Sequence, residues 1–304
     1  MPAAMAVPER VPGPAAAAWR VRGSTISLDE PVVMGILNLT PDSFSDGGVH
    51  ATTAEAVDAG LAMVADGAAI VDVGGESTRP GADSVSAEVE IARVARVIER
   101  LAAEGVVVSV DTSKPKVAQA AIDHGAAVVN DVTGLSDVAL REVCADTGVG
   151  VVIMHMQGVP KTMQVDPHYE DVVSEVKASL ERMARAALDA GMERDSIVID
   201  PGIGFGKNFA HNVELMAHLD VLTGIGYPLM IGTSRKGFLG KILEPIRGRT
   251  APHERDGATA ATVAMAVAAG VRILRVHNVR LAVEVAHTVD GMVPVDHGKE
   301  INRT

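Results

Sequence analysis

The stretch TAEAVDAGLAMVADGAAIVDVGG, residues 53–75, contains the unit from which the rest of the chain is built. Its first part, 53–67, places apolar residues near helical spacing and ends in Gly67, a residue suited to the carboxyl end of a helix. Its second part, 68–75, is a short apolar run, typical of a strand covered on both faces. The stretch therefore predicts a helix followed by a buried strand.

Similar apolar runs recur along the chain, most of them beginning at or just after Gly or Pro. The eight runs are VVMGILN (32–38), AAIVDVGG (68–75), VVVSVD (106–111), AAVVND (126–131), GVVIMH (150–155), SIVIDPG (196–202), PLMIGTS (228–234) and VRILRVH (271–277). Helix-like stretches such as 53–67, 88–105 and 175–191 lie between them. This alternation is typical of parallel strands joined by helical crossovers.

Eight such units in about 250 residues favour a closed (β/α)8 barrel, or TIM barrel, over an open doubly wound sheet. We therefore expect an α/β protein with one barrel domain at 31–291. Residues 1–30 are expected to form an N-terminal tail and a possible barrel-closing hairpin, and 292–304 a C-terminal tail. The segment WRVRGSTISLDE, 19–30, fits either that hairpin or a simple linker.

Composition narrows the class of protein. With 47% hydrophobic but only 2% aromatic residues, the 304-residue chain can bury a large core of small branched side chains. The net charge of -12 argues against a general affinity for nucleic acid or anionic membranes. No apolar run approaches the roughly 18 residues of a spanning helix. A single cysteine, Cys144, fits a buried thiol in a reducing compartment, so we expect a cytoplasmic protein.

Polar residues end every predicted strand, and in this fold active sites form at those carboxyl ends. The strand ends are Asn38, Asp72, Asp111, Asn130 with Asp131, Met154 with His155, Asp200, Gly232 to Lys236, and Arg275 with His277. One polar strand end is ordinary because Asp and Asn cap the next helix well. Asp72 and Asp131 fit this structural role as well as a functional one, but the whole ring indicates a ligand.

The residue types at these ends indicate what that ligand carries. Asp111, Asn130 and Asp200 can donate and accept hydrogen bonds in the plane of a heterocycle. Arg275 and His277 alternate along one strand and so point to the same side, where they can hold phosphate oxygens. The site thus predicts a heterocycle joined to phosphate.

Other signals in the chain are weaker. The segment PGIGFGKN, 201–208, lacks the spacing of a dinucleotide site, so a sharp turn after Asp200 is the preferred interpretation. Arg235 and Lys236 lie where a strand passes into a helix. The histidines do not have the spacing of a zinc site.

Eight blocks of sequence, in order, resemble the bacterial dihydropteroate synthase family of pterin-binding enzymes. They are MGILNLTPDSFSDGG (34–48), DVGGESTRPGA (72–82), SVDTSKPKVA (109–118), VVNDVTG (128–134), IMHMQGVPKTMQ (153–164), DPGIGFGKN (200–208), GTSRKGFLG (232–240) and LRVHNV (274–279). The resemblance covers about residues 30–290. It implies a transferase of folate biosynthesis that joins a dihydropterin, carried as its pyrophosphate, to p-aminobenzoate.

The resemblance also implies roles for individual residues. Pterin is expected to bind Asp111, Asn130, Asp200 and Lys236, in a pocket shaped by Met154, Phe205 and Gly232. Asn38 is expected to bind Mg²⁺ on the pyrophosphate, which Thr78, Arg275 and His277 also contact. The residues implied in catalysis are Asp111, Lys236, Arg275, His277 and Asp46.

The segment GILNLTPDSFSDGG, 35–48, begins with an apolar run and continues with many polar residues. The resemblance explains these polar residues. Residues 39–50 and 74–84 resemble the family's two mobile loops, which close over the substrates. The p-aminobenzoate site is expected to comprise Phe44, Thr78, Arg79, Pro80 and Gly237, and Asp46 is expected to order the closed loop. Many relatives have Ser where this chain has Gly237, whose backbone amide can still bind a carboxylate. The family also implies a homodimer. Its members are sulfonamide targets, and the sequence leaves open whether this chain is sensitive or resistant.

Three other functions fit parts of this pattern. A methyltetrahydrofolate:corrinoid methyltransferase shares a pterin-binding barrel but needs neither the two loops nor Arg275 and His277. A non-catalytic pterin-binding paralogue is expected to lack some of Asn38, Asp111, Arg275 and His277, and this chain has all four. An unrelated phosphate-binding barrel leaves Asp111, Asn130 and Asp200 without a role.

Overall fold

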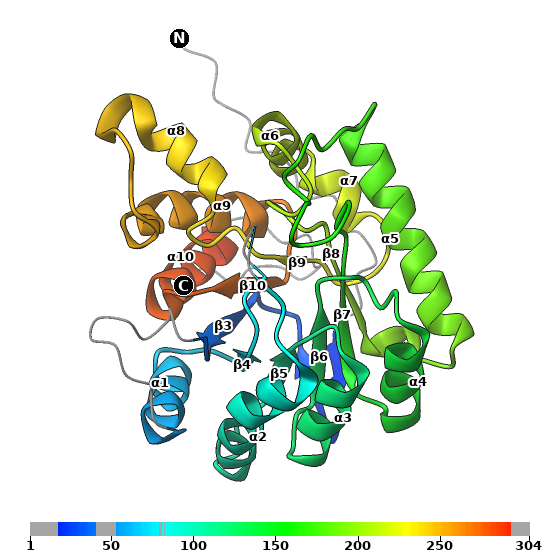
Figure 1. Ribbon diagram of the computed structural model, residues 1–304. Helices are drawn as coiled ribbons and strands as arrows, with labels where there is room; N and C mark the ends of the chain where they lie inside the picture. Colours follow the sequence, from blue (N-terminus) through cyan, green and yellow to red (C-terminus); the bar gives the residue numbers. More distant parts are fainter. Residues whose placement is uncertain (1–17, 41–52, 79–80, 82, 293–304) are drawn as a thin grey trace, which may run out of the picture.

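The computed structural model, which describes residues 18–40, 53–78, 81 and 83–292, contains a barrel of eight parallel strands surrounded by helices (Figure 1). The strands are β3 (Val32–Asn38), β4 (Ile70–Gly74), β5 (Val108–Asp111), β6 (Val128–Asp131), β7 (Gly150–Met154), β8 (Ile197–Asp200), β9 (Met230–Ile231) and β10 (Ile273–Val276). Their order is β8-β7-β6-β5-β4-β3-β10-β9, and a parallel bridge between Ile199 and Leu229 joins the two outer strands. The predicted closed barrel is confirmed, and every predicted run contains a strand.

Ten α-helices lie in the described part of the chain. They are α1 (Thr53–Ala65), α2 (Ala87–Ala103), α3 (Pro115–Asp123), α4 (Val138–Thr147), α5 (Val172–Asp189), α6 (Phe209–Ala217), α7 (Leu219–Thr223), α8 (Gly237–Arg247), α9 (Asp256–Ala268) and α10 (Val279–Met292). Short 3-10 helices, η2 (Arg194–Ser196) and η3 (Pro252–Arg255), precede β8 and α9. The three helices predicted from sequence correspond to α1, α2 and α5. Gly67, which follows α1, has the positive φ of 101° expected of a helix-ending glycine.

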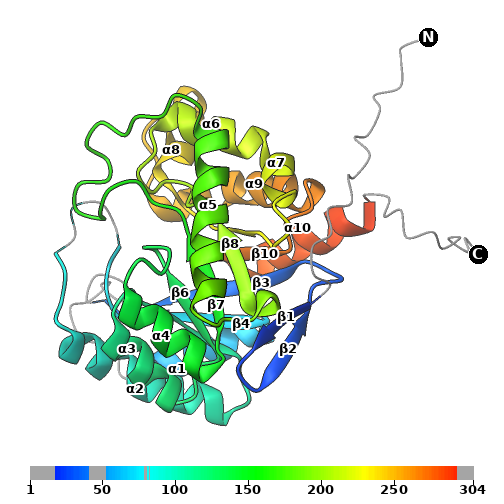
Figure 2. The ribbon, with the colours of Figure 1, turned by 90° about the vertical axis from the view of Figure 1, so that its right-hand side faces the viewer.

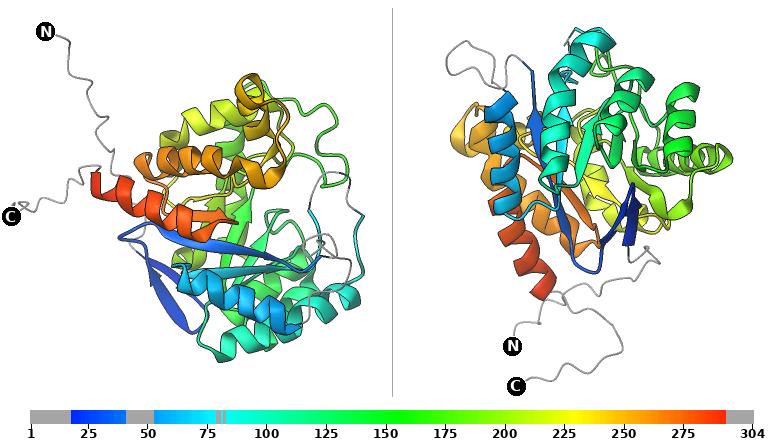
Figure 3. Two further views of the ribbon diagram at one scale, coloured as in Figure 1. Left: turned by 90° about the vertical axis from the view of Figure 1, so that its left-hand side faces the viewer. Right: turned by 90° about the horizontal axis from the view of Figure 1, so that it is seen from below.

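The segment at 19–30, which fitted a hairpin or a linker, contains a hairpin. Strands β1 (Ala18–Val21) and β2 (Ser24–Ser27) pair antiparallel and lie at the end of the barrel where the parallel strands begin (Figure 3). Trp19 is fully buried there, and its indole N–H donates to the Ser196 carbonyl, 3.0 Å away. The Arg22 amide donates to the Ala127 carbonyl at 3.2 Å. The hairpin therefore closes this end of the barrel.

The floor of the barrel interior is apolar. A buried cluster contains one side chain from each of seven barrel strands, together with residues of the hairpin. The strand members are Met34, Ile70, Val128, Val152, Val198, Met230 and Ile273. A second, larger cluster packs the outer faces of the strands against the helices and includes the buried Cys144, as predicted for that thiol. Among the described residues, no helix has the length and apolar character that a membrane span needs.

The packing of Trp19 generates a stability prediction. Replacing Trp19 with Ala removes the largest side chain of the floor cluster and leaves the Ser196 carbonyl without its donor. We expect a loss of about 3–5 kcal/mol in the free energy of unfolding, measured by urea unfolding followed by circular dichroism. Trp19→Phe fills most of the space and is expected to lose less. A loss below about 1 kcal/mol in Trp19→Ala would show that the hairpin is not part of the barrel core.

Candidate active site

The predicted site residues lie one layer above the apolar floor. Side chains two positions apart on a strand point to the same face, so the residue two positions after each floor residue also faces the interior. These residues are Ile36, Asp72, Asn130, Met154, Asp200, Gly232 and Arg275, with Asp111 two positions after the buried Ser109. The alternation of side chains along the strands therefore brings six of the predicted site residues together with Asp72 at the carboxyl end of the barrel.

A partly buried arginine, with 19% of its side chain exposed, connects residues of this layer. Arg275 on β10 donates from Nε to Asp72 Oδ2 and from its terminal nitrogen to Asp111 Oδ2, each at 2.7 Å. Asn130 donates from its side-chain amide to the same Asp72 oxygen at 3.0 Å. Asp72, for which the sequence left a helix-capping role open, is fully buried and belongs to this network. Asp131 instead accepts from the backbone amides of Thr133 and Leu135, which is a structural role.

The network leaves acceptors available inside the barrel. Asp72 Oδ1 and Asp111 Oδ1 are buried and have no hydrogen-bond partner among the described residues. Burial raises the pKa of Asp111 to about 7, and the neighbouring Arg275 opposes that rise. Burial would lower the pKa of Arg275, but Asp72 and Asp111 raise it above its ordinary value. Unsatisfied buried acceptors are rare in folded proteins and fit the N–H groups of a ligand.

A second pair of charged groups, Asp200 and Lys236, lies close enough to Arg275 to feel its charge. Asp200 Oδ1 accepts from the Gly202 amide at 2.7 Å, and burial raises the pKa of Asp200 while Lys236 opposes the rise. Lys236 donates from Nζ to the Ile203 carbonyl, and its Nζ lies 4.6 Å from the centre of the Phe205 ring. Burial lowers the pKa of Lys236 to about 8, against the effect of Asp200. Asp200, Lys236 and Phe205 therefore lie close to one another at the barrel mouth.

The chain turns sharply after Asp200, as the glycines predicted. Gly202 has a φ of +66°, and a Cβ there would lie 1.9 Å from the His155 carbonyl oxygen. Lys207, which the sequence did not single out, is 1% exposed and donates from Nζ to the carbonyls of Gly202 at 3.0 Å and Phe205 at 2.9 Å. A buried lysine thus stabilises the turn that carries Phe205.

The residues predicted for the anion lie at the ends of β10, β4 and β3. The side chain of His277 contacts Ser234 through Nδ1 at 2.9 Å, and the His277 amide donates to Ser234 Oγ at 3.1 Å. Thr78 is partly buried, four residues beyond the end of β4. The Asn38 side-chain oxygen lies 3.5 Å from where a Cβ on Gly74 would be, so it faces the end of β4. In the described part of the chain, the hydrogen bonds and ion pairs of the Arg275 side chain go to Asp72 and Asp111, and not to Thr78 or Asn38.

The p-aminobenzoate residues are only partly described. Gly237 begins α8 directly after Lys236, and a Cβ added to Gly237 would meet nothing within 4 Å. The Ser of many relatives would therefore be accommodated there. Phe44, Asp46, Arg79 and Pro80 lie outside the residues that the structure describes.

The donor set fits a magnesium ion held mainly by substrate. Among the described residues no group of three His, Cys, Asp or Glu side chains is arranged to hold a metal ion. Mg²⁺ commonly keeps several waters and is bound through one or two protein oxygens together with substrate phosphates. The side-chain oxygen of Asn38, partly exposed at the end of β3, provides one such oxygen.

Comparisons with known proteins agree with this geometry. The model of the pterin binding enzyme family matches residues 34–277. The dihydropteroate synthase of Escherichia coli K12 is 44% identical over 280 residues, 91% of this chain and 97% of that protein. The dihydropteroate synthase of Mycobacterium leprae is 45% identical over 267 residues, 87% of this chain and 94% of that protein.

Solved structures give the same result. The Yersinia pestis dihydropteroate synthase in a sulfonamide drug complex has a TM-score of 0.85 and 41% identity, covering 90% of this chain and 98% of its own. The Xanthomonas albilineans dihydropteroate synthase with 4-aminobenzoic acid also has a TM-score of 0.85, with 43% identity, covering 92% and 99%. The fold and its polar barrel mouth define a barrel enzyme that binds a small polar substrate. The chain belongs to the pterin-binding enzyme family and, within that family, to the dihydropteroate synthases.

The raised pKa of Asp111 predicts a pH effect on stability. Between its ordinary pKa of 3.8 and the folded value of about 7, the folded protein keeps a proton that the unfolded chain has lost. Ionisation of Asp111 therefore lowers stability as the pH rises through this window. The Asp111→Asn variant has no carboxyl group to ionise at this position. We therefore expect the stability of the wild type relative to the variant, measured as the difference in their unfolding free energies, to fall between about pH 5 and about pH 7. Urea unfolding at several pH values measures this difference, and a constant difference would contradict the prediction.

Proposed function

We propose that the protein condenses 6-hydroxymethyl-7,8-dihydropterin pyrophosphate with p-aminobenzoate to give 7,8-dihydropteroate and pyrophosphate, a reaction of folate biosynthesis. The observation that carries the proposal is the convergence of Arg275, Asp111 and Asp72 with Asp200 and Lys236 inside one barrel mouth. The similar Xanthomonas albilineans enzyme has been solved in complex with 7,8-dihydropteroate, at 40% identity and a TM-score of 0.81. The named relatives favour this synthase over the corrinoid methyltransferase.

The pterin ring fits the planar hydrogen-bonding groups. In this proposal Asp111, Asn130 and Asp200 bind the ring edges, while Lys236 donates to a ring acceptor. Met154, Phe205 and Gly232 form the walls, and a side chain at Gly232 would approach Arg275, since an added Cβ there would lie 3.7 Å from Arg275 Cβ. Interactions of these groups are strong because the side chains of Asp111, Asn130 and Asp200 are buried.

The reaction needs stabilisation of charge and no protein nucleophile. The bond between the pterin methylene carbon and the pyrophosphate oxygen breaks, and the amine nitrogen of p-aminobenzoate forms a new bond to that carbon and loses a proton. Arg275, His277 and Thr78 would bind the pyrophosphate as negative charge grows on it. The carboxylate of Asp111 would stabilise positive charge on the ring. Mg²⁺, held through Asn38, would further neutralise the leaving pyrophosphate when bound.

The second substrate is assigned to the neighbouring loops. Thr78 and the amide of Gly237 at the start of α8 would contact p-aminobenzoate, since a helix N-terminus favours a carboxylate. Phe44, Arg79 and Pro80 complete this proposed site, and Asp46 would order the loop that contains it. The protein is further proposed to work in the cytoplasm, to which its single buried cysteine is suited.

The reaction can be tested directly. Purified protein is mixed with the dihydropterin pyrophosphate, p-aminobenzoate and Mg²⁺, and both pyrophosphate release and dihydropteroate formation are followed. We expect turnover that requires Mg²⁺ and that falls at least about 100-fold in Asp111→Asn, because that variant loses a charge facing the ring. Tight binding of the pyrophosphate substrate without turnover would instead support the non-catalytic paralogue.

A homodimer is proposed through α6, α8 and α9, which lie together on one side of the barrel (Figure 2). These helices carry large apolar side chains that are at least 39% exposed, among them Phe209 and Val213 on α6, Ile242 and Ile246 on α8, and Met265 on α9. Exposed apolar side chains on neighbouring helices favour a protein interface. Ile246, at 78% exposure, is the most exposed of them.

Sedimentation tests the proposed dimer. The wild type is expected to sediment with the mass of two chains, and Ile246→Lys is expected to raise the dimer dissociation constant by about tenfold or more, because a charge would be buried in the interface. Val138→Lys, at a 57% exposed apolar position on α4, which lies away from these helices in Figure 1, serves as the control. A monomeric wild type, or dimers equally stable in both variants, would contradict the assignment.

A further inference from the structure

Arg235 has an unusual backbone for its residue type. Its φ is +60°, in the left-handed region that side chains other than those of Gly, Asn and Asp seldom adopt. It lies between Ser234, which contacts His277, and Lys236, which lies beside Asp200. Residues held in this region gather at functional sites, where their surroundings must enforce the conformation. The groups that hold Arg235 in this conformation therefore bear on the function of the site.

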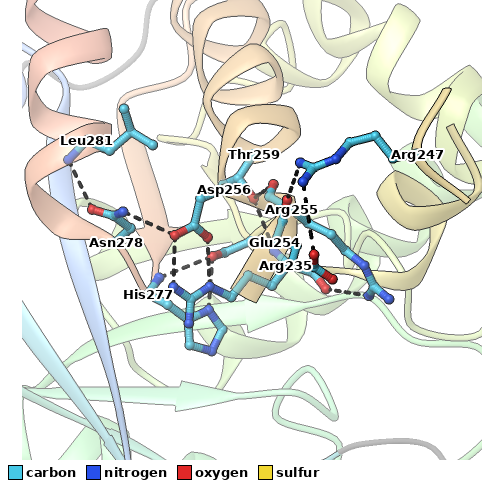
Figure 4. Close-up of polar contacts among 10 residues, drawn as sticks. Arg235, Arg247, Glu254, Arg255, Asp256, Thr259, His277, Asn278 and Leu281 are labelled. Carbon is cyan, nitrogen blue, oxygen red and sulfur yellow. Dashed lines mark hydrogen bonds and ion pairs between the residues drawn. The ribbon is translucent and has the colours of Figure 1, made fainter. Parts of the chain in front are cut away.

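Three residues at the start of α9 hold it. The Arg235 amide donates to Thr259 Oγ1 at 3.1 Å, and the Arg235 carbonyl accepts from the Arg255 guanidinium at 2.9 Å. The Arg235 side chain donates from Nε and from a terminal nitrogen to the two carboxylate oxygens of Asp256, at 2.7 and 2.9 Å. The two-point ion pair raises the pKa of Arg235 and lowers that of Asp256. Figure 4 shows these side chains meeting around Asp256.

Asp256 also contacts the end of the next strand. The side-chain amide of Asn278 donates to Asp256 Oδ2 at 3.1 Å. Asn278 follows His277, and its own side-chain oxygen accepts from the Leu281 amide at 3.2 Å, at the start of α10. One carboxylate therefore connects the turn after β9, which carries Lys236, to the turn after β10, which carries His277 (Figure 4).

We propose that Asp256 is a positioning residue for the reaction, which fixes Lys236 relative to His277 through Arg235 and Asn278. Lys236 is assigned to the pterin ring and His277 to the pyrophosphate, so the spacing between them must match one substrate molecule. Asp256 touches neither substrate half itself. The inference rests on the proposed function and adds a residue that the family resemblance did not imply for this chain.

The test compares two nearby acidic residues. Asp256→Asn keeps the size of the side chain but provides only one acceptor oxygen and no charge for Arg235. Glu254→Gln is the matched control, because Glu254 also lies near an arginine, Arg247, at 4.0 Å, and accepts from the Ala251 amide, yet contacts neither strand end. The measurements are KM and kcat with the dihydropterin pyrophosphate, binding of inorganic pyrophosphate with Mg²⁺ by calorimetry, and the midpoint of thermal unfolding.

We expect Asp256→Asn to raise KM for the dihydropterin pyrophosphate and to weaken pyrophosphate binding, each by about tenfold, the size typical of losing a charge-assisted hydrogen bond. Glu254→Gln is expected to match the wild type in both. Lower thermal stability of Asp256→Asn with unchanged KM and unchanged pyrophosphate binding would make Asp256 merely structural and overturn the inference.

A second variant tests the route through Arg235 and remains informative if Asp256→Asn does not fold. Arg235→Lys keeps the charge but cannot donate to both carboxylate oxygens in the same geometry. It is expected to raise KM like Asp256→Asn, and the double variant is expected to be no worse than either single variant. Additive losses, or Arg235→Lys with wild-type kinetics, would overturn the inference. Absence of turnover in both the wild type and Glu254→Gln would instead count against the proposed function.

Discussion

The ion pairs of Arg275 with Asp72 and Asp111 are the interaction on which the interior of the barrel depends. A guanidinium cannot be buried in a protein without anions to compensate it, and removing one member leaves an uncompensated charge. Here β10 supplies the cation, and β4 and β5 supply the carboxylates. Asn130 extends the network to β6. The network thus fixes side chains from four strands before any ligand enters, and it leaves one oxygen of each carboxylate available.

The rest of the fold makes this arrangement possible. Alternation along each strand places apolar side chains in the floor and polar side chains one step above it, so the same strands provide stability and chemistry. The hairpin with Trp19 closes the opposite end, which leaves the carboxyl ends of the strands as the place where substrate binds. Asp200 is followed by the turn that Lys207 supports, and Lys236 is close enough to oppose the rise in the pKa of Asp200. Members of both charged groups are suited to a ring, and Arg275 and His277 are suited to an anion.

The local periods of the sequence were sufficient to predict the barrel and the ring of polar strand ends. Helical and strand periods are properties of neighbouring residues, and the position of an active site follows from the fold class. Pairing was harder to predict, because Arg275 lies 203 residues from Asp72 and 164 from Asp111. The sequence for that reason left Asp72 between a capping and a functional role.

Lys207 and Asp256 were missed for a related reason. A buried lysine and an exposed one look alike in sequence, and Asp256 at the start of a helix has the ordinary appearance of a capping residue. The roles of Phe44, Asp46, Arg79 and Pro80 stay predictions, since they lie outside the described residues. The hairpin was one of two alternatives because short polar strands lack a strong period of their own.

The most direct measurement is a crystal structure of the protein with the dihydropterin pyrophosphate bound. We expect the pterin ring to lie inside the barrel mouth, with its edges bonded to Asp111, Asn130 and Asp200, and with its pyrophosphate directed toward Arg275 and His277. The available oxygen of Asp111 is expected to accept a hydrogen bond from the ligand. A pterin bound outside the barrel, or a pyrophosphate directed away from Arg275 and His277, would show that these residues do not form the substrate site.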